Sequence, residues 1–324
     1  MKLFSQWAAL SGSFLQLFSG QEQQQQQQNT EPAVDLPFLE HWGHYAAATY
    51  QRFENWQGCT ACQLADIQQT RLNATWSTMF PAAFSRGYVG VNREHKEIVV
   101  AFRGSTHIMD ALSDIQLFQS PWPLDISGSL VHSGFLQAYL AARPHVFRSL
   151  DTLLLASDDP ELKDYTLCFT GHSLGGAQAT LAYLDYMMHA DQQMLSRNMP
   201  KLITFGAPRV GNKYFAKAIN GARNFSNVDS LALRVVHEMD LVPRLPRSAY
   251  PGQYAHSDRE IWARDTTDEE SMDLVQCQTF SDSSAHDDGY LEDRNCSAGT
   301  NPLLWNVVPD HMVYPGMRLG IPKY

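Results

Sequence analysis

A serine lies between two glycines at residues 171–175, Gly-His-Ser-Leu-Gly. The apolar run 165–170 before it is typical of a core strand, and the apolar run 177–188 after it is typical of a helix. Glycines two positions either side of Ser173 remove side chains that would clash in a sharp strand-turn-helix connection. Such a turn lifts the serine hydroxyl above a sheet. The stretch therefore predicts a nucleophile elbow, rather than a serine that only fills a turn.

A serine nucleophile needs a general base, and the base needs an acid that orients it. In α/β-hydrolases the acid and then the histidine follow the serine along the chain. Asp240 comes just after the apolar run 231–237, where a parallel sheet presents side chains at its carboxyl edge. His311 lies in a proline-flanked loop at 306–316. Spacing favours this pair but leaves other downstream acids and histidines open, namely Asp229, His189, His237, His256 and His286.

The segments that must position these residues alternate between two kinds of pattern. β-branched, apolar runs predict strands at 87–91, 98–103, 165–170, 201–205 and 231–237. Helical patterns occupy 38–50, 134–156, 177–188 and 212–219. Pro144 should break the second of these helices or start a new one. This alternation predicts an α/β protein whose predominantly parallel central sheet is flanked by helices.

Composition limits the function. The chain has 324 residues, of which 44% are hydrophobic and 18% charged, which suits one large domain. Its formal net charge of −10 excludes nucleic acid as an expected partner, because basic surfaces drive that binding. Residues 264–300 are rich in Asp, Ser and Thr, interrupt the strand-helix pattern and predict a surface insertion. We expect the single folded domain to cover 37–324.

The N-terminal residues indicate export. Residues 1–20 resemble a secretory signal peptide, too interrupted by polar residues to serve as a permanent membrane anchor. Residues 21–36 form a glutamine-rich linker that should be disordered. A secreted, extracellular protein would also account for three glycosylation sequons, at Asn73, Asn224 and Asn295.

The chain has five cysteines. In a secreted protein we pair Cys59 with Cys62 and Cys277 with Cys296, and leave Cys168 reduced within its core strand. The alternative for the first pair is a zinc site with His41 and His44.

Six motifs in order carry a family resemblance: FRGS, VHSGF, GHSLGGA, TFGAPRVGN, RVVHEMDLVPRLP and DHMVYPG. Together they resemble the class 3 lipase family of filamentous fungi, which is related to feruloyl esterases. The likeness extends over most of residues 38–324. It implies an α/β-hydrolase fold, hydrolysis of acyl esters and no cofactor or metal.

Carried over position by position, the resemblance implies Ser173 as nucleophile, Asp240 as acid and His311 as base. It assigns Ser105 to the oxyanion hole, and the N–H of Leu174 joins it by its place after the nucleophile. Residues 107–115 then resemble the lipase lid, with an apolar face and polar neighbours made by Ile108, Met109, Ala111, Leu112, Asp114 and Ile115. Relatives often carry tryptophan where this chain has Ala111, which weakens the expected grip on an interface.

These observations predict a secreted serine ester hydrolase that acts as a monomer at an oil–water interface. A triacylglycerol lipase is the leading function, because the lid is apolar. The alternatives on the same fold are a feruloyl or other carboxylesterase and a phospholipase or diacylglycerol lipase. A lipase-like binding protein without catalysis is a further alternative from another class.

Overall fold

The structure, a computed structural model, describes the folded part of the chain with short gaps. The described ranges are 34–80, 83–106, 118–198, 200–222, 231–248, 253–257, 259–268, 271–277, 292–307 and 309–319. All of these ranges belong to one compact unit that begins at residue 34. The predicted signal peptide and nearly all of the predicted linker therefore lie outside the described residues.

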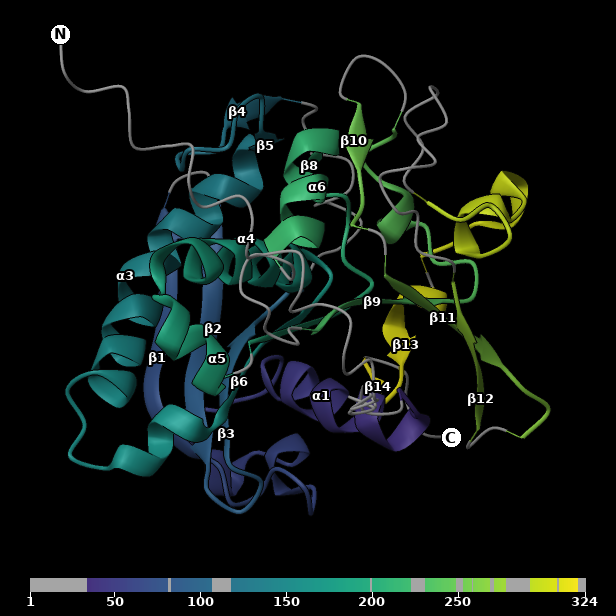
Figure 1. Ribbon diagram of the computed structural model, residues 1–324. Helices are drawn as coiled ribbons and strands as arrows, with labels where there is room; N and C mark the ends of the chain where they lie inside the picture. Colours follow the sequence, from purple (N-terminus) through teal and green to yellow (C-terminus); the bar gives the residue numbers. More distant parts are fainter. Residues whose placement is uncertain are drawn as a thin grey trace, which may run out of the picture. The chain divides into compact units, whose positions relative to one another are not determined.

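An eight-stranded sheet forms the centre of this unit (Figure 1). Its order is β1 (Arg71–Phe80), β2 (Ala83–Asn92), β3 (Glu97–Phe102), β6 (Thr166–His172), β7 (Lys201–Phe205), β9 (Leu231–His237), β11 (Glu260–Asp265) and β12 (Met272–Gln276). The strands from β3 to β11 are parallel, whereas β1, β2 and β12 add antiparallel pairs at the two edges. The predicted strands are therefore present within a predominantly parallel sheet.

Helices cover both faces of the sheet (Figure 1). The helices are α1 (Leu36–Ala48), α3 (Ser133–Leu154), α4 (Leu174–His189), α5 (Gln192–Asn198) and α6 (Lys213–Ala222). Alternate residues of β3 point to opposite faces: Ile98 and Val100 join the core beneath α3, α4 and α6, and Val99 joins the core beneath α1. This alternation buries both faces and makes the strands read as continuous apolar runs.

Shorter elements complete the described unit. A four-stranded sheet has the order β10 (Tyr254–Ala255), β8 (Gly211–Asn212), β5 (Leu130–His132) and β4 (Gln119–Pro121). A hairpin of β13 (Val313–Tyr314) and β14 (Met317–Arg318) packs beside α1 (Figure 1). The 3₁₀ turns are η1 (Trp56–Gly58), η2 (Ala61–Gln63), η3 (Pro160–Asp164), η4 (Val242–Arg244), η6 (Ser297–Gly299), η7 (Pro302–Leu304) and η8 (Asp310–Met312).

Pro144 does not break its helix, contrary to our prediction. Helix α3 runs through it without interruption. Pro144 is exposed, and the carbonyl that loses its helical partner belongs to Leu140, a residue that is itself exposed. Water can satisfy that carbonyl, which lowers the cost of the proline.

The prediction of an insertion from residue 264 onward misses the end of the main sheet. Residues 272–276 form the edge strand β12, paired with β11 from Ile261 to Asp265. The strand is short and only half-buried, so its sequence lacks the apolar run that identified the inner strands.

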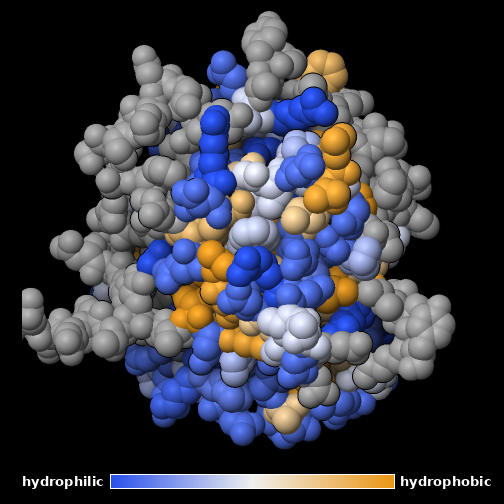
Figure 2. Space-filling view, turned by 90° about the vertical axis from the view of Figure 1, so that its right-hand side faces the viewer, coloured by the Kyte–Doolittle hydropathy of each residue, from blue (hydrophilic) through white to orange (hydrophobic). Residues whose placement is uncertain are grey.

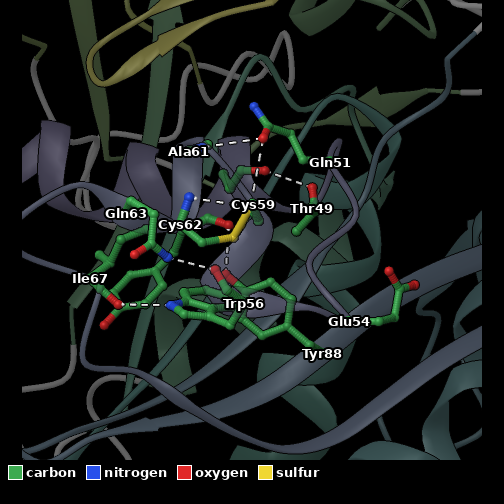
Figure 3. Close-up of a disulfide and its surroundings, with 12 residues drawn as sticks. Thr49, Gln51, Glu54, Trp56, Cys59, Ala61, Cys62, Gln63, Ile67 and Tyr88 are labelled. Atoms are coloured by element: carbon green, nitrogen blue, oxygen red, sulfur yellow. Dashed lines mark hydrogen bonds between the residues drawn. A yellow bond between two sulfur atoms is a disulfide. The ribbon is translucent and has the colours of Figure 1, made fainter.

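Both predicted disulfides are present. Cys59 bonds to Cys62, and Cys277 bonds to Cys296, while Cys168 is a buried free thiol. Figure 3 shows the first pair against Trp56, with the Gln51 side chain accepting a hydrogen bond from the N–H of Ala61. The sulfurs of the zinc alternative are thus bonded to each other. Among the described residues, Glu260, Cys277 and Cys296 form a cluster of the kind that can bind a metal. Its two sulfurs are likewise bonded to each other.

His41 and His44 of α1 instead share a carboxylate. Nδ1 of each ring lies 2.9 Å and 2.8 Å, respectively, from Oδ2 of Asp66. Nε2 of His41 lies 2.9 Å from Glu97 at the start of β3. Burial opposes the charge on His41, but the hydrogen bonds to Asp66 and Glu97 outweigh it and raise the pKa of His41 to about 9. The pKa of Asp66 is lowered: burial opposes its charge, but the two histidines outweigh it.

We expect this cluster to make stability fall as the pH rises. The raised pKa of His41 contributes stability that is complete below pH 6.5 and is lost as the pH passes about 9. The lowered pKa of Asp66 contributes stability that is complete above its ordinary value of 3.8 and is lost as the pH falls below it. Both contributions are therefore complete between pH 3.8 and pH 6.5. Urea unfolding of the wild type should therefore lose about 2–3 kcal/mol between pH 6.5 and 9.5.

The His41→Gln variant is the test, because it keeps a polar group and removes the titration. Its unfolding free energy should lack this alkaline decline. His95→Gln, which changes an exposed histidine against the His41 ring, is the matched control and should keep it. Equal slopes in wild type and His41→Gln would contradict the prediction.

Among the described helices, none combines the length and the apolar character that a membrane crossing requires.

Candidate active site

Ser173 lies at a sharp turn between β6 and α4. Its φ of 58° and ψ of −130° place it in a strained region for a residue with a side chain. The turn is held by a 2.9 Å hydrogen bond from its N–H to the carbonyl of Phe205 in β7. A Cβ on Gly171 would lie 2.5 Å from the backbone of Gly175, so glycine alone fits there. The elbow geometry that the sequence predicts is present.

Asp240 and His311 meet at the carboxyl edge of the sheet, although they are 71 residues apart. Nδ1 of His311 lies 2.8 Å from Oδ2 of Asp240, and both side chains are almost fully buried. The backbone N–H of Val242 donates to Oδ1 of Asp240 over 2.8 Å. Because a carboxylate oxygen accepts from Nδ1–H, the proton on Nδ1 leaves Nε2 of His311 free to accept one.

The elbow lies beside the loop that carries His311. Nε2 of His172 is 2.9 Å from the carbonyl oxygen of His311, and the two imidazole rings are 4.4 Å apart. Oγ of Ser173 and Nε2 of His311 are both buried, and neither has a hydrogen-bond partner within the described part of the chain. A nucleophile and a base with these open positions could pass a proton between them once a substrate is bound.

The predicted oxyanion groups flank the elbow. Leu174 is the first residue of α4, so its N–H has no acceptor within the helix. Ser105 follows β3 by way of Gly104, which packs against the elbow: a Cβ there would lie 3.0 Å from Cβ of Ser173 and 2.2 Å from the Tyr50 hydroxyl. The loop before Ser105 is therefore held close to the nucleophile.

Some predicted site residues cannot be placed. The lid residues Ile108, Met109, Ala111, Leu112, Asp114 and Ile115 lie outside the described residues, as do the sequon Asn224 and the alternative residues Asp229 and His286. Asn73 and Asn295 are exposed, and Asn73 lies at an irregularity in β1 where its side chain accepts a hydrogen bond from Ser149.

The remaining alternative histidines have other partners. His237 contacts the carbonyl of Asp310 and the carboxylate of Asp265, and His256 lies 2.7 Å from the carbonyl of Pro243. Nδ1 of His189 lies 2.8 Å from the backbone carbonyl oxygen of Asp185, four residues earlier in the same helix. None of these contacts joins Asp240 or Ser173.

Sequence reasoning missed two residues that support Asp240. The Tyr314 hydroxyl donates to Oδ2 of Asp240 over 2.5 Å, and burial followed by the Asp240 charge raises the pKa of Tyr314 well above its usual value. The Arg244 guanidinium donates to the carbonyls of Asp240 and Ser297. Both lie within motifs quoted above: Tyr314 in DHMVYPG, three residues after His311, and Arg244 in RVVHEMDLVPRLP.

Comparisons with known proteins show what this chain is similar to. The family Lipase (class 3) matches residues 99–250. The chain is 30% identical to a lipase of Rhizomucor miehei over 263 residues, which are 81% of this chain and 63% of that protein. It is 29% identical to secreted mono- and diacylglycerol lipase 1 of Fusarium solani, over 72% of this chain and 65% of that protein. The chain thus spans less than two thirds of either relative.

A solved structure has a similar fold. It is described as a triacylglycerol lipase whose catalytic centre is a serine protease triad. The match has a TM-score of 0.70 and 27% identity, and covers 90% of this chain and 97% of that one. The central sheet, the helices on its two faces and the elbow at the end of β6 are those of an α/β-hydrolase. The family match, the fungal relatives and the solved structure together support the class 3 lipase family of filamentous fungi as the family of this chain.

Proposed function

We propose that the protein hydrolyses carboxylic esters of lipids, triacylglycerols foremost, through a Ser173–His311–Asp240 triad. The observation that carries the proposal is the buried pair of open atoms, Oγ of Ser173 and Nε2 of His311, with Asp240 fixed on the far nitrogen of the imidazole. The family relationship supports the same chemistry.

In this mechanism Ser173 attacks the ester carbonyl while His311 takes the hydroxyl proton. Asp240 holds His311 in the required tautomer and stabilises the imidazolium that forms. The N–H groups of Ser105 and Leu174 stabilise the negative oxygen of the intermediate, each worth about 3–4 kcal/mol. His311 then returns the proton to the leaving alcohol. Water releases the acyl group by the same steps, so the reaction needs neither a cofactor nor a metal.

The relatives, which are lipases, support a lipid substrate, and some large apolar side chains are exposed at the surface. Phe118 is 70% exposed and Leu303 of η7 is 91% exposed. Figure 2 shows hydrophobic patches within the largely hydrophilic face that it views. We assign the lid function to residues 107–115, and expect a secreted, glycosylated monomer that works at an oil–water interface.

A second candidate is hydrolysis of mono- and diacylglycerols. It is favoured by the similarity to the Fusarium lipase of that name. The two candidates share the triad and differ only in how many acyl chains the bound substrate carries.

One panel of substrates separates these functions. Initial rates would be measured in one buffer on emulsified triolein, diolein and monoolein, on a phospholipid, on dissolved p-nitrophenyl butyrate and on methyl ferulate. A triacylglycerol lipase should hydrolyse triolein at least as fast as the partial glycerides, and Ser173→Ala should remove every activity. Partial glycerides alone would select the second candidate. Methyl ferulate as the best substrate, or no hydrolysis at all, would reject the lipase function.

A further inference from the structure

Tyr50 and His172 form a chain of hydrogen bonds behind the site. Tyr50 follows α1, and its hydroxyl lies 2.8 Å from Nδ1 of His172. On the other side of the ring, Nε2 of His172 lies 2.9 Å from the carbonyl oxygen of His311. Gly104 packs against the same hydroxyl, since a Cβ on Gly104 would lie 2.2 Å from it. Residues from four separate segments are thus in contact in one line, namely Gly104, Tyr50, His172 and His311.

The donors and acceptors allow only one direction along this chain. A carbonyl oxygen can only accept, so Nε2 of His172 must carry the proton. Burial, then the proximity of His311, holds the pKa of His172 well below its ordinary value, so the ring is neutral and Nδ1 carries no proton. Nδ1 therefore accepts from the Tyr50 hydroxyl, which lies against Gly104. Each hydrogen bond fixes the direction of the next.

This line of contacts ends at two backbone segments whose relative position matters for catalysis. Gly104 precedes Ser105, whose N–H is the proposed oxyanion donor. The carbonyl at the other end belongs to His311, the proposed base. The chain is also closely packed, because a Cβ on Gly104 would approach the carbonyl of His172 to 2.6 Å.

We propose that Tyr50 and His172 are positioning residues: their hydrogen-bonded chain fixes the distance between the oxyanion loop at Gly104 and the loop of His311, an inference that rests on the proposed function. Neither side chain contacts the reacting atoms of the ester. A change of order 1 Å in the relative position of base and oxyanion donors is enough to slow the chemical step strongly.

The sharpest test removes a single hydroxyl. Tyr50→Phe keeps the ring and deletes the hydrogen bond from its hydroxyl to His172, so kcat on dissolved p-nitrophenyl butyrate should fall about tenfold while KM stays within about twofold. Tyr45→Phe is the matched control on the same N-terminal segment. It deletes a buried hydroxyl that bonds to Thr70 and Asn92, remote from the elbow, and should leave kcat within about twofold of wild type.

His172→Gln tests whether the two residues act together. Glutamine can still donate toward the His311 carbonyl, but it offers no acceptor at the Nδ1 position. If the chain acts as a unit, the double variant with Tyr50→Phe should be no more than about twofold slower than the worse single variant. Nitrogen-15 NMR of the wild type gives a readout independent of activity: His172 should show the Nε2–H tautomer and should stay neutral where an ordinary histidine becomes protonated.

The outcomes are distinct. If Tyr50→Phe matches Tyr45→Phe in kcat, or His172 carries its proton on Nδ1, the positioning role is wrong while the proposed triad stands. Independent, multiplying losses in the double variant would equally overturn the chain as a unit. A wild-type protein inactive on every ester would instead refute the proposed function itself. Should His172→Gln fail to fold, Tyr50→Phe and the NMR tautomer decide.

Discussion

Replacing Ser173 with alanine should lower kcat/KM on p-nitrophenyl butyrate by at least about a thousandfold, because the change removes the proposed nucleophile and nothing else. The elbow should survive, since its backbone hydrogen bond to Phe205 and its close glycine contacts do not involve the hydroxyl. Circular dichroism and the midpoint of urea unfolding would confirm that the variant is folded. A folded variant with more than about a hundredth of wild-type activity would show that Ser173 is not the nucleophile.

The backbone of Ser173 makes a second replacement informative. At a φ of 58° an alanine keeps the steric strain of the serine, whereas a glycine relieves it. Ser173→Gly should therefore be inactive and yet more stable to urea than Ser173→Ala, by up to about 1 kcal/mol. Such a result would show that the strained turn which positions the hydroxyl lowers the stability of the fold. A glycine variant less stable than the alanine variant would contradict this account of the turn.

Asp240→Asn should reduce kcat by about 10⁴-fold with little change in KM. The new amide can donate to Nδ1 of His311, and this favours the tautomer with its proton on Nε2. That nitrogen could then no longer take the proton of Ser173. In the wild type the Tyr314 hydroxyl donates to Oδ2 of Asp240 and the N–H of Val242 donates to Oδ1. In the variant these two donors would compete for the one amide oxygen. Single-turnover kinetics on p-nitrophenyl butyrate would show the loss in the acylation step.

Two variants accompany this measurement. Asp229→Asn changes the other acid that the sequence left open, and it should retain wild-type activity. Tyr314→Phe leaves the carboxylate in place and removes one hydrogen bond to it, so its loss should be near tenfold. If Asp229→Asn were the inactive variant and Asp240→Asn the active one, the acid would have to be reassigned.

The parts of the site that were predictable are those with a local signal. Ser173 lies in a turn whose glycines are close in sequence, and Asp240 follows a strand that its β-branched residues identify. Even so, spacing alone left several partners for the serine, and the choice of His311 depended on the order of six motifs. The contact of His311 with Asp240 spans 71 residues, a separation at which no periodic pattern applies.

The residues that escaped prediction act through tertiary contacts. Tyr50 looked like the end of an aromatic helix, yet its hydroxyl meets His172 from 122 residues away. Pro144 looked like a break in a helix, because the sequence does not reveal that Pro144 and Leu140, whose carbonyl loses its helical partner, are both exposed. The edge strand β12 was missed for a related reason: one exposed face replaces the apolar run by which buried strands are recognised.

Cys168 has a consequence for oxidative folding. It lies in β6 at the centre of the sheet, fully buried, and burial raises the pKa of its thiol well above the ordinary value. Once β6 has paired with β3 and β7, this thiol is neither ionised nor accessible, so it cannot attack the two disulfides and scramble them. A chain that is oxidised before the sheet forms has no such protection, and a bridge made to Cys168 would keep β6 out of its place. The order in which this protein folds and oxidises thus decides whether the strand that presents Ser173 can form at all.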